Sequence, residues 1–164
     1  MAWQREVSRL LEQEHHDHMD LLGQLEPRLA RAARGGTFAD PELVRLCGRL
    51  AGQLERDMVR HFDFEEQELF PRLAECGDGD IAALLADEHS AIREVAIELL
   101  PLVRAAGRGE LPAADGPLLV RGALELIERQ AAHIQKESMA LLPLLEDLLD
   151  EPTDRELAMA YATA

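Results

Sequence analysis

HFDFEEQELFPRL (residues 61–73) and HIQKESMALLPLL (residues 133–145) follow one pattern and begin 72 residues apart in this chain. Each stretch starts with His, has Glu four residues later, and then places Leu, Pro and Leu at the same spacing. Residues i and i+4 of a helix lie on one face, about 5–6 Å apart. Each stretch therefore predicts a helix that presents an imidazole and a carboxylate to one point. Together, the two stretches predict two sides of one metal site.

A second repeat, with a spacing of 74 residues, covers the segments that precede these stretches. The matched positions are Leu10-Leu11 with Leu84-Leu85, Glu14-His15 with Glu88-His89, and Arg34-Gly35 with Arg108-Gly109. The first half of the chain thus resembles the second half, which predicts internal pseudo-twofold symmetry.

Apolar residues at alternating steps of four and three predict four long helices. The helices cover residues 3–34, 41–74, 80–106 and 118–150. Gly35-Gly36 ends the first helix, Asp40-Pro41 begins the second, and Pro71 kinks or ends the second near its last turn.

The predicted fold is an all-α, up-down-up-down four-helix bundle, because short or moderate loops join neighbouring helices. Residues 1–150 form the predicted metal-binding bundle, and residues 151–164 form a C-terminal helical tail. Within this tail, Pro152 separates the bundle from a short final helix over residues 154–162, which Thr153 caps.

The composition is that of one globular domain. The chain has 164 residues, of which 47% are hydrophobic and only 4% aromatic, and a formal net charge of −15. That charge argues against nucleic acid and against an anionic membrane surface as partners. No apolar stretch is long enough for a membrane span or a signal peptide, so we expect a cytoplasmic, reduced protein. Cys47 is then a buried free thiol.

Six polar side chains fall at one level of the predicted bundle. They are His15, His61, Glu65, His89, His133 and Glu137. Each buried polar group without a partner costs about 1–3 kcal/mol. A pair of divalent cations would satisfy all six, because imidazoles serve as terminal ligands and two carboxylates bridge the ions. A lone His on an apolar seam is more often a hydrogen-bonded core residue, but four at matched positions favour a metal site.

The order His…His-x-x-x-Glu…His…His-x-x-x-Glu resembles the hemerythrin-like family, the HHE cation-binding domains. Glu65-Glu66 and Leu69-Phe70-Pro71 also match, and the resemblance covers residues 1–150. It implies a non-haem di-iron centre held by the six residues. The oxygen carriers of the family have a further His where this chain has Ile92-Arg93, and an Asp where it has Glu137. The chain is therefore more similar to the four-histidine branch, which includes iron–sulfur repair proteins, although their cysteine-containing N-terminal segment is not seen here.

Six such ligands leave coordination positions for an oxo or hydroxo bridge between two Fe ions and for a small ligand. We therefore expect a protein that binds or reacts with O2, NO or peroxide, in sensing, detoxification or iron handling. If it is an enzyme, it is a peroxide- or NO-directed di-iron oxidoreductase. The alternative is a regulatory or interaction module with a structural metal. A ferritin-like oxidase is disfavoured, since such bundles use Glu-x-x-His pairs. Zinc or manganese in place of iron, and a monomer or a homodimer, stay open.

His18 is a further candidate ligand, because it follows His15 by three residues on the same seam. The other interpretation is that it hydrogen-bonds a neighbouring carboxylate or carbonyl. His16 is expected to face solvent, and Phe62 and Phe64 are expected to pack rather than gate.

Glu14 and Glu88 precede their histidines at matched positions. They are predicted either to accept hydrogen bonds from ligand histidines or to form salt bridges between helices. Glu66 and Glu68 are expected on a solvated face. Tyr161 is expected to be an ordinary tail residue rather than to fold over the end of the bundle.

Overall fold

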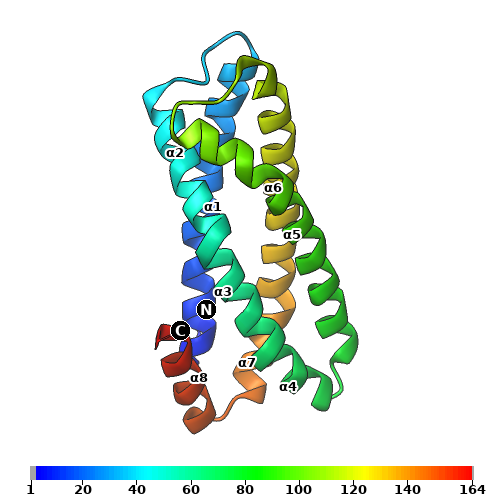
Figure 1. Ribbon diagram of the computed structural model, residues 1–164. Coiled ribbons are helices and arrows are strands. Elements are labelled where there is room, and N and C mark those ends of the chain that lie inside the picture. The colour runs from blue at the N-terminus through cyan, green and yellow to red at the C-terminus, as the bar shows by residue number, and fades with distance from the viewer. Residues whose placement is uncertain (1–2, 164) are drawn as a thin grey trace.

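The computed structural model describes residues 3–163, which form helices and loops without β-strands. The helices form four long rods and one shorter final helix. Figure 1 shows that the rods run in alternating directions and that the final helix lies beside the start of the first rod. The first and third rods are α1 (Glu6–Ala33) and α5 (Gly79–Gly107). The second contains α2 (Pro41–Gly52), α3 (Met58–Phe64) and α4 (Phe70–Glu75), and the fourth contains α6 (Gly116–Lys136) and α7 (Leu142–Leu148). The predicted all-α bundle with a short C-terminal helix is confirmed.

The helix ends follow the sequence signals. Gly35 and Gly109 have φ of 98° and 69°, a conformation that glycine adopts without a steric penalty. In both cases the next residue donates its N–H to the carbonyl five residues earlier, which closes a Schellman motif. Asp40 caps α2 by accepting the N–H of Leu43 at 2.9 Å.

The second and fourth rods continue past Pro71 and Pro143 through two π-helical turns, η2 (Glu65–Leu69) and η4 (Glu137–Leu141). Proline lacks an N–H, and its ring clashes with the carbonyl four residues back. The residue before each proline bonds the carbonyl five residues back instead, that of Glu65 or Glu137. The second rod therefore does not end at Pro71 but continues to Glu75, so the predicted helix end is wrong and the predicted kink stays a prediction. A widened turn precedes each proline, and it begins at the Glu of each His-x-x-x-Glu motif.

A third π-helical turn, η1 (Gln53–Asp57), joins α2 to α3 and has no counterpart in the fourth rod. It contains no proline, and the sequence analysis did not predict it. A 3-10 turn, η3 (Ala113–Asp115), leads into α6.

The final helix, α8 (Glu151–Thr163), begins three residues earlier than predicted. The Asp150 side chain accepts the N–H of Thr153 at 2.9 Å, so Asp150 rather than Thr153 provides the cap. Pro152 lies in the first turn, where its missing N–H leaves no helical bond unmade. The predicted division of the chain after residue 150 falls between α7 and α8 and stays a prediction.

Two apolar clusters fill the bundle, one on each side of a polar layer. One cluster joins leucines of α1 and α2 with residues of α5 and α6, and includes Leu22, Leu46, Ile92 and Leu126. The other lies at the end where α8 packs, and includes Leu11, Leu69, Leu85, Leu145 and Tyr161. On the first, third and fourth rods the histidines and glutamates of the predicted site lie between the two clusters in sequence, and on the second rod His61 and Glu65 flank Phe62 and Phe64, where one cluster gives way to the other.

Within residues 3–163, no helix is long and apolar enough to cross a lipid bilayer. Cys47 is buried and free, as predicted, and burial raises the pKa of its thiol to about 11. Such a thiol is unreactive at neutral pH.

Candidate metal centre

All six predicted ligands converge in the polar layer. They are His15 of α1, His61 of α3, Glu65 of η2, His89 of α5, His133 of α6 and Glu137 of η4, and every one is buried. Their ligand atoms form two groups, each with all its atoms within 4.8 Å of one another. One group contains the first two histidines and the other contains the last two. Glu65 and Glu137 belong to both groups.

The two oxygens of each carboxylate face different histidine pairs. Glu65 places Oε1 3.3 Å from His61 Nε2 and Oε2 3.2 Å from His89 Nε2. Glu137 places Oε2 2.8 Å from His15 Nε2 and Oε1 2.8 Å from His133 Nε2. A carboxylate that bridges two cations needs this arrangement, because it must offer one oxygen to each.

These close contacts are not aligned as hydrogen bonds. All four oxygens of Glu65 and Glu137 are buried and lack a hydrogen-bond partner among the described residues. Such atoms are costly to bury unless a cation or proton satisfies them. His89 Nε2 also lies only 3.0 Å from His133 Nε2. The nitrogen and oxygen donors therefore fit divalent metal ions.

Three of the four histidines are oriented by a carboxylate at Nδ1. His61 pairs with Glu14 at 2.6 Å, His89 with Glu66 at 2.8 Å, and His133 with Glu88 at 2.9 Å. An ionised carboxylate only accepts, so each Nδ1 is the donor and each Nε2 keeps its lone pair for a metal.

Both interpretations of Glu14 and Glu88 are confirmed, because each carboxylate also binds a cation on a neighbouring rod. Glu14 accepts from Arg60 at 3.0 Å, and Glu88 accepts from Lys136. The expectation that Glu66 is solvated is wrong, since it accepts from His89 and from Arg93, the latter at 2.6 Å. The double Glu at 65–66 was the available signal for this role.

His15 is the exception, because its Nδ1 has no hydrogen-bond partner among the described residues. In the repeat, the position that matches Glu66 is occupied by Ser138, an exposed residue. The carboxylate that supports His89 is therefore absent from the matching position, and the two halves of the centre differ.

The electrostatics of the layer favour positive charge. Burial lowers the pKa of His89, but its contacts with Glu137 and Glu65 outweigh this and raise it to about 9. The pKa of His61 and of His133 is raised for the same reason, against the effect of burial. Burial alone would raise the pKa of Glu137, but the surrounding histidines hold it well below its ordinary value. In the absence of a metal, protons on the imidazoles supply the charge that the carboxylates attract.

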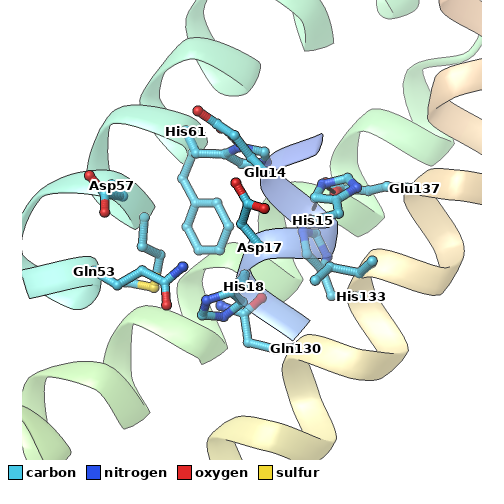
Figure 2. A pocket seen from close by; sticks show the side chains of 13 residues that line it. Glu14, His15, Asp17, His18, Gln53, Asp57, His61, Gln130, His133 and Glu137 are labelled. Carbon is cyan, nitrogen blue, oxygen red and sulfur yellow. Dashed lines mark hydrogen bonds and ion pairs between the residues drawn. The ribbon is translucent and has the colours of Figure 1, made fainter. Parts of the chain in front are cut away.

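A cavity of about 190 Å³ reaches the His15–His61 half of this layer. Figure 2 shows His18 in this cavity, with Gln53 of η1 on one side and Gln130 of α6 on the other. His18 belongs to neither group of clustered ligand atoms among the described residues. Burial lowers its pKa to about 4, so the ring is neutral near pH 7. The other predictions for this region hold, since His16 is exposed, and both Phe62 and Phe64 are buried.

Phe62 packs directly on the centre. Its ring stacks on that of His89, with centroids 3.7 Å apart and planes 9° from parallel. Arg93 lies over the same Phe62 ring, 5.3 Å from its centroid. These contacts fix the His89 imidazole on two sides, because Arg93 also binds the Glu66 carboxylate that supports it.

A family model described as the Hemerythrin HHE cation binding domain matches residues 6–145 of the chain. The matched range includes all six predicted ligands and His18, and it ends before α8 begins. No curated protein matches the sequence.

Proposed function

This chain belongs to the hemerythrin HHE cation-binding domain family, and from that premise we propose that it is a non-haem di-iron protein that binds or reacts with O2, NO or peroxide. The supporting observation is that the two oxygens of Glu65, and those of Glu137, face different histidine pairs. A site for a single ion would need only one oxygen of each carboxylate.

In this proposal His15 and His61 would hold one iron ion, His89 and His133 would hold the other, and Glu65 and Glu137 would be shared. Iron ions held by these residues would supply redox chemistry and could bind a small ligand. Glu14, Glu66 and Glu88 keep three imidazoles in the tautomer that offers Nε2.

The surroundings of the centre restrict which molecules reach it. Apolar clusters lie on both sides of the layer and close it toward the two ends of the bundle. The cavity past His18 has room for a diatomic molecule or peroxide, and among the six candidate ligands it is lined by His15, His61, His133 and Glu137. Neutral His18 both donates and accepts hydrogen bonds, which suits a small polar ligand. The net charge of −15 supports the absence of nucleic acid and anionic membranes as partners.

The proposal is tested by the optical spectrum of the iron-loaded protein in air, before and after addition of peroxide and then azide. We expect absorption bands that change with each addition. His15→Ala should alter the spectral response to peroxide and azide. His16→Ala is the matched control, because it removes an exposed imidazole from the same turn and should leave the response unchanged. If iron is bound but its spectrum changes with neither peroxide nor azide, the result would contradict the proposal. It would support instead a regulatory or interaction module in which the metal is structural.

His18→Leu is expected to leave the metal content unchanged and to raise the stability of the metal-free protein. The matching residue in the second half is Ile92, and both ring nitrogens of His18 are buried without a partner among the described residues. Removing them should stabilise the fold by about 1–2 kcal/mol. Iron analysis and thermal unfolding measure the two effects, with His16→Leu as the exposed control. Loss of one ion from the His18 variant would show that His18 is a ligand.

A further inference from the structure

The C-terminal helix α8 is joined to the start of the bundle by buried polar contacts. Asp154 is only 5% exposed and accepts the N–H groups of Glu6 at 2.8 Å and Val7 at 3.0 Å. These are first-turn N–H groups of α1, which have no partner within their own helix. Figure 1 shows α8 beside this end of α1. The family match ends at residue 145, so α8 lies outside the matched domain.

Tyr161 of α8 reaches the residues around the metal centre. The expectation that it is an ordinary tail residue is wrong, since it is only 3% exposed. Its hydroxyl donates to Glu14 Oε2 at 2.5 Å, and the same oxygen accepts from His61 Nδ1 at 2.6 Å. Its ring packs on Phe64, with centroids 4.5 Å apart, and lies 4.6 Å from the guanidinium carbon of Arg60.

Three donors therefore hold the Glu14 carboxylate in place. Arg60 binds Oε1, while Tyr161 and His61 share Oε2. Burial and the neighbouring carboxylate raise the pKa of Tyr161, which keeps the phenol protonated and able to donate. A chain of hydrogen bonds thus runs from α8 through Glu14 to His61.

Within residues 3–163, the second half of the molecule has no such connection. Glu88 matches Glu14 in the repeat and accepts from His133 and Lys136, both of the fourth rod. Tyr161 is the only tyrosine in the chain. In addition, among the residues that the structure describes, His15 has no partner at Nδ1, and Glu14 is the only carboxylate that accepts from the Nδ1 of a candidate ligand histidine in the first half.

We propose that Tyr161 is a positioning residue of the metal centre, which acts through Glu14 on His61 and sets the metal affinity of the His15–His61 half. This inference rests on the proposed function, because it takes His61 as a ligand. The loss of the hydroxyl would leave Glu14 Oε2 with one donor and would free the carboxylate to turn away. His61 would then be less well oriented, and the ion nearest to it would bind more weakly. The other ion would be little affected.

The test is a Co²⁺ titration of the metal-free full-length chain, followed by visible absorption. In Tyr161→Phe the ring and its packing remain, and only the hydroxyl is lost. We expect one of the two binding steps to weaken by about three- to tenfold, somewhat less than the 10–100-fold typical of a residue that contacts a ligand histidine directly. The absorption of that one site should change as well. Met159→Ala is the control and should match the wild type, because Met159 lies on the same helix and is 71% exposed.

A double-mutant cycle shows whether Tyr161 acts through Glu14. In a Glu14→Gln background, Tyr161→Phe should cause no further weakening, because the carboxylate through which it acts is already gone. An equal weakening in both backgrounds would overturn the proposal, as would wild-type affinity and absorption in Tyr161→Phe itself. A wild-type chain that takes up no Co²⁺ would instead overturn the proposed function and this inference with it.

Because the chain has a single tyrosine, growth on 3-fluorotyrosine labels position 161 alone and keeps its hydroxyl. We expect Zn²⁺ loading to shift the ¹⁹F resonance in the wild-type sequence and to shift it much less in Glu14→Gln. A ¹⁹F resonance that does not shift on Zn²⁺ loading, in a chain shown to bind Zn²⁺, would overturn the proposal. Misfolding could not account for that result, because the chain keeps its wild-type sequence.

Discussion

Glu137→Ala is expected to remove both metal ions from the protein, whereas His133→Ala is expected to weaken one. Glu137 faces His15 with one oxygen and His133 with the other, so its loss takes a ligand from each half. His133 contributes to one group only. Iron analysis after reconstitution measures both variants. Because Glu137 belongs to both groups of ligand atoms, Glu137→Ala should also show less metal-dependent stabilisation than His133→Ala.

The internal repeat supplies the matched variants for this experiment. Glu65→Ala should behave as Glu137→Ala does, and His61→Ala as His133→Ala does, since each pair occupies equivalent positions. Ser138→Ala changes the exposed residue next to Glu137 and should keep both ions. A series in which the Glu137 and His133 variants are silent while those of Glu65 and His61 abolish binding would refute the equivalence of the halves.

Removal of the metal is expected to lower the thermal stability strongly. A ligand at a thousand times its dissociation constant stabilises the fold by about 4 kcal/mol per site. Two such sites give about 8 kcal/mol, which for a chain of this size shifts Tm by roughly 15–30 °C. Thermal unfolding with excess Zn²⁺, which has no redox chemistry, and with a chelator measures the difference. Equal Tm values in the two conditions would contradict a metal site within the folded core.

The same experiment at several pH values should show opposite trends with and without metal. The folded-state pKa of His89 is raised from 6.5 to about 9. Its protonation therefore stabilises the metal-free protein fully below pH 6.5, and this contribution, on the order of 3 kcal/mol, is lost as the pH rises through about 9. In the metal-loaded protein protons compete for the imidazoles, so the stabilisation by metal falls as the pH decreases. A metal-free protein that gains stability between pH 6.5 and 9 would contradict a raised pKa for His89 in the folded state.

The sequence predicts which buried polar residues converge, because their spacing is a helical property. His and Glu at i and i+4, repeated 72 residues later, must face one point if both segments are helices, and the structure brings them together. The helix ends at Gly35 and Gly109 follow from the same kind of local signal. These features depend on residues close together in the sequence, so the sequence alone was sufficient to predict them.

The features that the sequence analysis missed depend on contacts between distant segments. Glu66 looks like an exposed helical residue until Arg93 and His89 of α5 are placed beside it. Tyr161 is 147 residues from Glu14, and no periodic pattern links the two. Two of the three π-helical turns, η2 and η4, had a visible cause in Pro71 and Pro143. Proline, however, is equally consistent with a kink or a helix end, and only the packing of the following turn decides between them.

The number of iron ions per chain tests most directly whether Glu65 and Glu137 each join two ions. The metal-free protein is reconstituted with Fe²⁺ without oxygen, freed of loosely bound metal, and analysed for iron and protein. We expect two ions per folded chain, because each carboxylate offers one oxygen to each histidine pair. A folded chain that retains one ion, or none, would contradict the bridged centre.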